Sequence, residues 1–322
     1  MKKILSIDGG GIRGVIPAVL LAEIERRTGR PIAETFDLVA GTSTGGILAL
    51  GLTKPGTNGT ARYTASELVG LYEAEGAKIF RRDPWRRFVA LENLLDEKYP
   101  ATGIEAVLQD YFADTRMSQA LTEVLVTSYD IERRQPYLFK RHKAQKDPRR
   151  EWPMWQAARA TSAAPTYFEP AKLTFKGTQD YLALVDGGLY ANNPAMCGYV
   201  EARKLWPKDN DFLVVSLGTG ELTRRIPYDQ AKNWGLAKWA QPIMGVVFDG
   251  VSDAVDYQLR DLCADEATRV SQYHRFQVWL TEGNDDMDDA SRTNIRVLKL
   301  LAENLVDQRA ADLEQLCKAL AA

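Results

Sequence analysis

The sequence predicts an α/β fold in which helices alternate with the strands of a mainly parallel sheet. Three observations lead to this prediction. Short apolar runs recur along the chain, glycine-rich turns follow several of them, and helical patterns fill stretches between them. Strands are expected at residues 3–7, 36–40, 122–130, 182–185 and 212–217. Strands and helices that alternate along a chain are typical of a sheet whose faces are covered by helices.

Helices are expected where apolar residues recur at the spacing of one helix face. They cover residues 15–28, 66–80, 104–112, 154–164, 243–262 and 294–320. Ser66 is a candidate N-cap and Pro165 a stop signal. The chain has no internal repeat and no low-complexity linker. We therefore expect a single domain spanning residues 1–322, with the C-terminal helices at 291–320 packed on it.

The composition is that of an ordinary globular protein. The chain has 322 residues, of which 45% are hydrophobic and 26% charged, enough for one large core. Its net charge of -2 gives no overall basic field, which argues against a nucleic-acid duplex as the main partner. The three cysteines lie far apart, without a metal-binding or C-x-x-C spacing, so we expect reduced thiols and no metal site.

No targeting or membrane-spanning segment is apparent. The first apolar run, residues 4–7, is too short for the core of a signal peptide, and no stretch approaches the ~18 apolar residues of a membrane span. We therefore expect a cytoplasmic protein, which could still visit a membrane surface. The sequence does not predict the oligomeric state.

A candidate nucleophile lies on the turn Gly41-Thr42-Ser43-Thr44-Gly45. An apolar strand precedes this turn and a helical pattern follows it. A serine on such a strand-turn-helix unit projects its hydroxyl at the end of a sheet, and the small neighbours let strand and helix approach closely. The alternative is a plain loop in which Ser43 caps the helix.

A second glycine turn, Asp8-Gly9-Gly10-Gly11-Ile12-Arg13-Gly14, joins the first strand to a helix. Its free backbone N–H groups and the helix dipole would attract an anion. One alternative is a dinucleotide site, because Gly9, Gly11 and Gly14 match G-x-G-x-x-G, although Asp8 would face the pyrophosphate. The other is an oxyanion hole that serves Ser43, because one β-α-β unit would bring the two turns side by side.

A third turn, Asp186-Gly187-Gly188, follows the apolar strand at 182–185. Open α/β sheets place functional side chains at the carboxyl ends of their strands, so Asp186 is a candidate catalytic carboxylate. The alternative is that Asp-Gly-Gly only makes a good turn.

Two segments combine basic and aromatic residues. Residues 80–88 contain four arginines and three aromatics, and residues 133–150 contain eight basic residues against one acidic, a local net charge of +7. Arginine and aromatic side chains suit an acidic headgroup or a nucleotide. The alternatives are a connector with buried aromatics for the first segment and a hydrated loop for the second.

Taken in order, the three glycine motifs resemble those of the patatin-like phospholipases. The resemblance implies a three-layer α/β/α sandwich, a catalytic dyad of Ser43 and Asp186, and an oxyanion hole formed by the amides of Gly9, Gly10 and Gly11 with Arg13 close by. The motif glycines would be Gly14, Gly41, Gly45, Gly187 and Gly188. The implied substrates are acyl esters of membrane phospholipids, and no metal or organic cofactor is implied.

The histidines offer a rival to the dyad. A Ser-His-Asp triad could use His274, since Ser43, Asp186 and His274 follow the chain order of α/β-hydrolases, whereas His142 lies in the basic segment. The basic segment is a poor position for a buried base, and His274 falls at the start of an expected strand, whose alternation would direct its side chain to solvent or to the core. In a dyad Asp186 must take the proton itself, so we expect an apolar site that raises its pKa.

The resemblance extends to control of the enzyme. The compact chain is similar to bacterial patatin-like proteins, and among them to the phospholipase effectors of anti-phage systems, which cyclic oligonucleotides switch on. This resemblance implies that a cyclic di- or trinucleotide activates the protein and that the active protein contacts the membrane peripherally. The two basic segments are where an anionic messenger or headgroup would be expected to bind.

Overall fold

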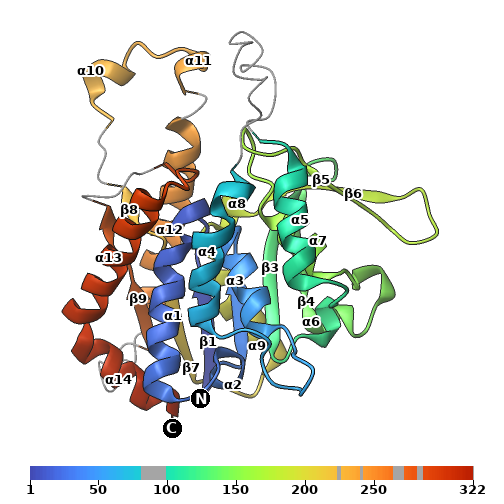
Figure 1. Ribbon diagram of the computed structural model, residues 1–322, viewed down its shortest axis with the longest axis vertical. Coiled ribbons are helices and arrows are strands. Elements are labelled where there is room, and N and C mark those ends of the chain that lie inside the picture. The colour runs from blue at the N-terminus through green and yellow to red at the C-terminus, as the bar shows by residue number, and fades with distance from the viewer. Residues whose placement is uncertain (81–98, 223–225, 240–241, 264–271, 281–285, 322) are drawn as a thin grey trace.

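A central sheet of eight strands organises the protein (Figure 1). The computed structural model describes residues 1–80, 99–222, 226–239, 242–263, 272–280 and 286–321. The strands follow the order β5-β6-β3-β2-β1-β7-β9, and β4 pairs with β3 as well. Their bounds are β1 Lys2–Ile7, β2 Leu38–Gly41, β3 Glu123–Asp130, β4 Gln135–Lys140, β5 Ala171–Thr174, β6 Tyr181–Asp186, β7 Phe212–Leu217 and β9 Tyr273–Phe276. A separate pair joins β8, Glu221–Leu222, to β10, Trp279–Leu280.

Both faces of the sheet are buried, because alternate residues of the central strands enter two different cores. In β1, Ile4 packs into one core and Leu5 into the other. In β2, Leu38 and Val39 divide in the same way. Since side chains alternate across a strand, this division shows helices on both faces of the sheet. The predicted three-layer α/β/α sandwich is confirmed.

The helices are distributed unequally over the two faces. One core includes residues of α1, α3, α4, α5, α7, α13 and α14, and the smaller core those of α9 and α12. The bounds of these helices are α1 Val15–Thr28, α3 Thr44–Thr53, α4 Ala65–Ile79, α5 Ala101–Phe112, α7 Met154–Thr161, α9 Ala195–Leu205, α12 Pro242–Leu262, α13 Arg292–Gln308 and α14 Ala310–Ala321. Short helices are α2 Ile32–Thr35, α6 Arg141–Ala144, α8 Gly188–Ala191, α10 Tyr228–Ala231 and α11 Leu236–Trp239.

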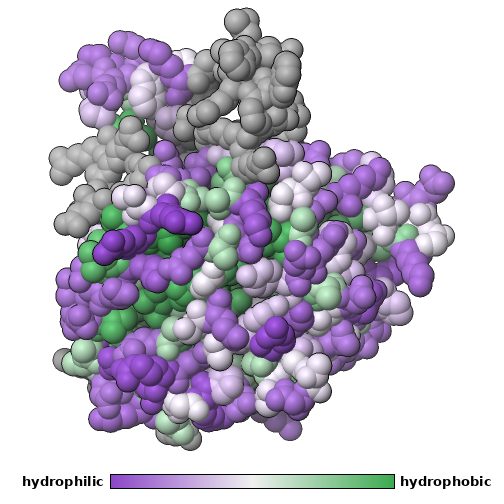
Figure 2. Space-filling model, in the orientation of Figure 1, coloured by the Kyte–Doolittle hydropathy of each residue, from purple (hydrophilic) through white to green (hydrophobic). Residues whose placement is uncertain are grey.

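The two ends of the chain lie close together (Figure 1). The Lys3 ammonium donates a hydrogen bond to the carbonyl of Leu320 at 2.7 Å. Helices α13 and α14 both pack against α1. On the face shown in Figure 2, hydrophilic side chains cover most of the surface, and hydrophobic ones are visible mainly between the outer helices.

The strand β3 has an unusual set of partners that positions the site. Its residue Val126 pairs with Gly41 of β2 on one edge and with Phe139 of β4 on the other. Two residues further on, Ser128 pairs with Asp186 of β6 and again with β4. Because β4 occupies one edge throughout, β2 and β6 share the other. β2 is parallel to β3 and β6 antiparallel, so their carboxyl ends point at each other.

The structure corrects three local predictions. Helix α4 begins at Ala65, and its cap is Thr64, which forms a capping box with Glu67, instead of Ser66. Helix α7 ends at Thr161, because the residues after it turn away and the carbonyl of Ala163 accepts a hydrogen bond from the Asp186 N–H at 3.0 Å. The basic segment 133–150 is not a loop throughout, since it contains β4 and α6.

We predict that burial, and not helix propensity, decides the cost of truncating leucines in the outer helices. Leu21 in α1 is fully buried, and Leu300 in α13 is 50% exposed. Leu21→Ala should lower the free energy of unfolding by about 2–5 kcal/mol, and the matched control Leu300→Ala by less than about 1 kcal/mol. Urea unfolding of both variants measures the difference. Equal losses would contradict the assignment of α1 to the core.

Candidate active site

Ser43 occupies a strained position between β2 and α3. Its backbone has φ 55° and ψ −124°, a conformation that costs a non-glycine residue about 1–3 kcal/mol. The turn is tight because Gly45 packs against β1: a Cβ at Gly45 would lie 2.1 Å from the carbonyl oxygen of Ile7. The Ser43 N–H donates to the Thr161 hydroxyl at 2.8 Å. These contacts hold a turn of the nucleophile-elbow type, with its serine at the sheet edge.

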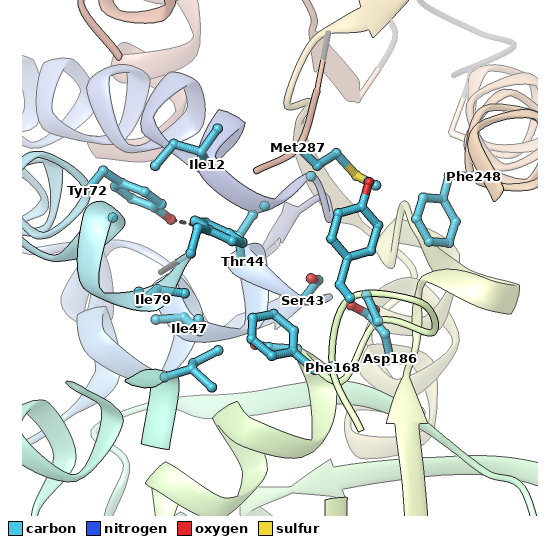
Figure 3. A pocket seen from close by; sticks show the side chains of 18 of the residues that line it. Ile12, Ser43, Thr44, Ile47, Tyr72, Ile79, Phe168, Asp186, Phe248 and Met287 are labelled. Carbon is cyan, nitrogen blue, oxygen red and sulfur yellow. Dashed lines mark hydrogen bonds between the residues drawn. The ribbon is translucent and has the colours of Figure 1, made fainter. Parts of the chain in front are cut away.

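Asp186 reaches Ser43 from the facing strand end. The Ser43 turn follows β2, Asp186 ends β6, and both strands pair with the same edge of β3. The Asp186 carboxylate lies close enough to Ser43 for the serine side chain to lower its pKa, and its Oδ1 accepts the N–H of Gly188 at 2.7 Å. The side chains of Ser43 and Asp186 both line one cavity (Figure 3). The structure thus brings together the two residues that the sequence singled out.

The electrostatics of Asp186 are those of a buried carboxylate. Only 1% of the residue is exposed, and this burial raises its pKa to about 7. The hydrogen bond from Gly188 and the nearby Ser43 side chain favour the ionised form and oppose the shift without cancelling it. A carboxylate with a pKa near 7 is a far better proton acceptor at neutral pH than a solvated aspartate.

Thr127 fills the space between the two strand ends. Its hydroxyl and that of Thr42 lie 2.7 Å apart, and Thr42 in turn donates to the Ala191 carbonyl at 2.6 Å. Gly187 packs directly on Thr127, because a Cβ at Gly187 would lie 2.1 Å from the Thr127 hydroxyl oxygen. Thr127 therefore links the turn that carries Ser43 to the turn that follows Asp186.

The first glycine loop lies beside Ser43. Gly9 and Ile12 use their N–H groups to bind the carbonyls of Asn192 and Met287, at 3.0 and 2.8 Å. The N–H groups of Gly10 and Gly11 have no hydrogen-bond partner among the described residues, and both glycines line the cavity. Two of the three predicted oxyanion donors are thus available, whereas the N–H of Gly9 is already bound.

The two charged residues of this loop are both buried, and only Asp8 lies elsewhere than expected. The predicted position of Asp8, facing the mouth of the loop, is wrong: it is 2% exposed and its Oδ2 accepts a hydrogen bond from Arg275 at 2.6 Å. Burial raises the pKa of Asp8, although Arg275 opposes the shift. Arg13 is buried too, and its Nε donates to the Gly10 carbonyl at 3.3 Å. Neither side chain lines the cavity.

The cavity is mostly apolar, although Ser162, Tyr167 and Asn192 line it as well as the two catalytic candidates. It encloses about 750 Å³ of empty space, its open mouth included, which is within the range of small-molecule sites. Its apolar wall includes Ile12, Ile47, Ile79, Phe168, Phe248 and Met287, which Figure 3 labels. Leu71, Phe80 and Ile104 complete it. The polar Thr44 and Tyr72 are hydrogen-bonded to each other at 2.6 Å. Such a wall suits a hydrocarbon chain better than a nucleotide.

Neither histidine lines this cavity. His274 lies on β9 beside Val215 of β7, half-buried, and burial lowers its pKa while Asp312 opposes the shift. His142 lies on α6 between two carboxylates, 3.3 Å from Glu123 and 3.2 Å from Glu201. The structure therefore does not bring a histidine to Ser43.

The structure describes only part of the two basic segments that were predicted to bind an anion. Within residues 80–88, all but Phe80 lie outside the described residues, including Arg86 and Arg87, and Phe80 lines the cavity. In the second segment, ion pairs with carboxylates involve Arg133, Lys140, Arg141 and Arg149. Much of its positive charge is thus neutralised locally.

Sequence reasoning missed the polar residues that support the site. Thr127, Thr161 and Thr219 bind backbone or side-chain groups of the catalytic turns. They lie far from the glycine motifs in sequence, and a lone threonine carries no signal by itself. Within the described part of the chain, no cluster of three or more His, Cys, Asp or Glu side chains could hold a metal ion. None of the helices described there could span a bilayer.

Comparisons of the sequence with a family model and with known proteins point to the same family. A family model described as patatin-like phospholipase matches residues 5–197. Patatin-like protein 4 of Arabidopsis thaliana is 32% identical over 94% of this chain and 83% of its own length. Patatin-T5 of Solanum tuberosum is also 32% identical, over 95% and 84%. Another Solanum tuberosum protein, named probable inactive patatin-3-Kuras 1, is 31% identical over 97% and 88%.

A weaker similarity exists to a solved structure. The crystal structure of VipD from Legionella pneumophila aligns with a TM-score of 0.38 at 11% identity, over 95% of this chain and 67% of that one, and we draw nothing from it. The matched residues 5–197 contain all three glycine motifs that surround the cavity. The chain therefore belongs to the patatin-like phospholipases, a family of lipid acyl hydrolases.

Proposed function

We propose that this protein hydrolyses acyl esters of membrane phospholipids with a dyad of Ser43 and Asp186. The observation that carries the proposal is that these two side chains line one largely apolar cavity, with Asp186 beside Ser43 and its pKa raised by burial to about 7. The cavity would take a fatty acyl chain and leave the headgroup outside. The protein would then reach a phospholipid by binding at the surface of the bilayer.

In the first half of the reaction, Ser43 Oγ attacks the carbonyl carbon of the ester while Asp186 takes the hydroxyl proton. The carbonyl oxygen gains the electron pair and becomes an oxyanion, to which Gly10 and Gly11 would donate their N–H groups. When the carbonyl forms again, the bond to the alcohol breaks. The alcohol, a lysophospholipid, leaves with the proton from Asp186.

In the second half, water hydrolyses the acyl group on Ser43. Asp186 takes a proton from the water, whose oxygen attacks the acyl carbon and forms a second oxyanion. Its collapse breaks the bond to Ser43 Oγ, which recovers the proton from Asp186. A fatty acid is released and both side chains return to their starting states, so the cycle needs no cofactor.

Ser43→Ala should abolish release of fatty acid from phospholipid vesicles without unfolding the protein. Alanine keeps the Cβ and so the same backbone strain, and only the nucleophilic hydroxyl is lost. Mass spectrometry of the lipids measures the reaction, and a fluorophosphonate probe should label Ser43 in the wild type alone. Because one relative is named inactive, family membership cannot replace this experiment.

His274→Ala is the matched control for the identity of the base. It should leave hydrolysis within about 2-fold of wild type, since His274 lies outside the cavity and contributes no proton transfer. A folded but inactive His274→Ala variant would favour the Ser-His-Asp alternative. An active Ser43→Ala variant would exclude both mechanisms.

The rate should follow the ionisation of Asp186. A base must be ionised to accept a proton, and the pKa of this carboxyl is raised to about 7. kcat/KM should therefore level off above pH 7 to 8 and fall with decreasing pH, to about one hundredth of its maximum at pH 5. Asp186→Asn should fold and be nearly inactive at every pH. A profile that is flat down to pH 5 would show that Asp186 is not the base.

We propose separately that a cyclic di- or trinucleotide raises this activity, with residues 133–150 as its contact. The support is a set of exposed cations in this segment that form no ion pair within the described residues: Arg134, Lys143, Lys146 and Arg150. The plant relatives add no support for a role in anti-phage defence.

Lys143→Ala combined with Lys146→Ala should remove activation of vesicle hydrolysis by the nucleotide and leave the basal rate unchanged. These lysines are better targets than Arg141, whose ion pair with Glu123 supports the fold. Full activity of the wild type alone, with no thermal shift in any cyclic nucleotide, would refute activation.

A further inference from the structure

The peptide group between Gly9 and Gly10 joins a residue that lines the cavity to one that does not. Its N–H belongs to Gly10, which lines the cavity, and its carbonyl belongs to Gly9. The described chain contains no cis peptide bonds, so this N–H and carbonyl point in opposite directions. Any group that fixes the Gly9 carbonyl also fixes the direction of the Gly10 N–H.

Thr219 binds that carbonyl. Its hydroxyl donates to the Gly9 oxygen at 2.6 Å, a short hydrogen bond for a neutral donor and acceptor. Thr219 comes from the turn after β7, is 3% exposed and does not line the cavity. A Cβ at Gly10 would lie 2.3 Å from the Thr219 hydroxyl oxygen, so the threonine packs directly behind the glycine.

The other contacts of the loop act at different points. The hydrogen bonds to Asn192 and Met287 use the N–H groups of Gly9 and Ile12. The N–H and Nε of Arg13 bind the Gly10 carbonyl, which belongs to the next peptide group. Among the described residues, the Thr219 hydroxyl alone binds the carbonyl of the peptide that presents the Gly10 N–H.

We propose that Thr219 is a positioning residue of the oxyanion hole. Its hydroxyl holds the Gly9–Gly10 peptide in the orientation that directs the Gly10 N–H at the reacting oxygen. By accepting a hydrogen bond at its carbonyl, the same peptide group also becomes a stronger N–H donor. The inference rests on the proposed function, because it gives Thr219 a role only if Ser43 generates an oxyanion.

Thr219→Val tests the role, because valine has nearly the same shape and no donor. Replacing the glycines would be less informative, since a Cβ at Gly10 or Gly11 would collide with its surroundings. We expect kcat to fall by about 10- to 100-fold, less than the 10²- to 10³-fold for a donor that is removed outright, with KM within about 2-fold of wild type. Thr219→Ser keeps the donor and should recover most of the lost kcat.

Thr53→Val is the matched control. Thr53 is fully buried at the end of α3, and its hydroxyl donates to the Ala49 carbonyl at 2.7 Å, outside the cavity. The substitution makes the same chemical change and should leave kcat unchanged. If Thr219→Val does not fold, Thr219→Cys, with a weak donor on a similar frame, should give a kcat between those of wild type and a donorless site.

A pair of ligands separates positioning from general structural damage. Ser43 Oγ attacks the carbonyl of a trifluoromethyl ketone lipid analogue, and the carbonyl oxygen becomes an oxyanion. The matching ether lipid has no carbonyl and cannot form one. Thr219→Val should weaken inhibition by the ketone by about the same factor as kcat and leave binding of the ether unchanged. Equal losses for both ligands, an unchanged kcat, or a serine variant as slow as the valine variant would each overturn the proposal.

Measurements on the wild-type protein separate a failure of the proposed function from a failure of the role given to Thr219. If it neither hydrolyses phospholipid nor reacts with the fluorophosphonate at Ser43, the proposed function and the role of Thr219 are both wrong. If the wild type is active and depends on Ser43, while Thr219→Val has the kcat of the wild type, only the role of Thr219 is wrong.

Discussion

The site depends on one edge of one strand, because β2 and β6 both pair with the same side of β3 and face each other there. Backbone hydrogen bonds in register with β3 fix how far apart the two strand ends lie. A shift of β6 by one residue would reverse its side chains and turn Asp186 away from Ser43. β3 therefore sets the spacing of two residues that are far apart in sequence, and Thr127 occupies the gap between them.

The sequence predicted the alternating α/β architecture and the identity of the facing residues, because glycine turns after apolar strands leave a strong local signal. It did not predict the direction of the strand that carries Asp186 to the site. Asp186 does end its strand, as expected, but in a sheet predicted to be mainly parallel the sequence did not reveal that β6 runs antiparallel to β3. Strand direction depends on pairing partners distant in the chain, and a local pattern of apolar residues holds no information about them.

The polar supports of the site escaped prediction for a related reason. Asp8 looks like an exposed charge at the start of a glycine loop, and only the fold brings Arg275 of β9 to its side. Likewise, the basic segment 133–150 has a net charge of +7 in sequence, but β4 and α6 place its Lys140 and Arg141 beside Glu201 of α9 and Glu123 of β3. Charge counted along a segment therefore says little about charge presented at a surface, because neutralising groups come from other elements.

The buried carboxylate also links catalysis to folding. In the unfolded chain Asp186 would ionise near its ordinary pKa, whereas in the folded protein it keeps its proton up to about pH 7. The folded state thus binds this proton more tightly, so its contribution to stability is complete below about pH 4 and is lost as the pH rises through 7. At the pH where the base works, the fold tolerates an ionised carboxylate in an apolar site at a cost on the order of a few kcal/mol. Readiness for reaction and resistance to unfolding are therefore opposed at this one side chain.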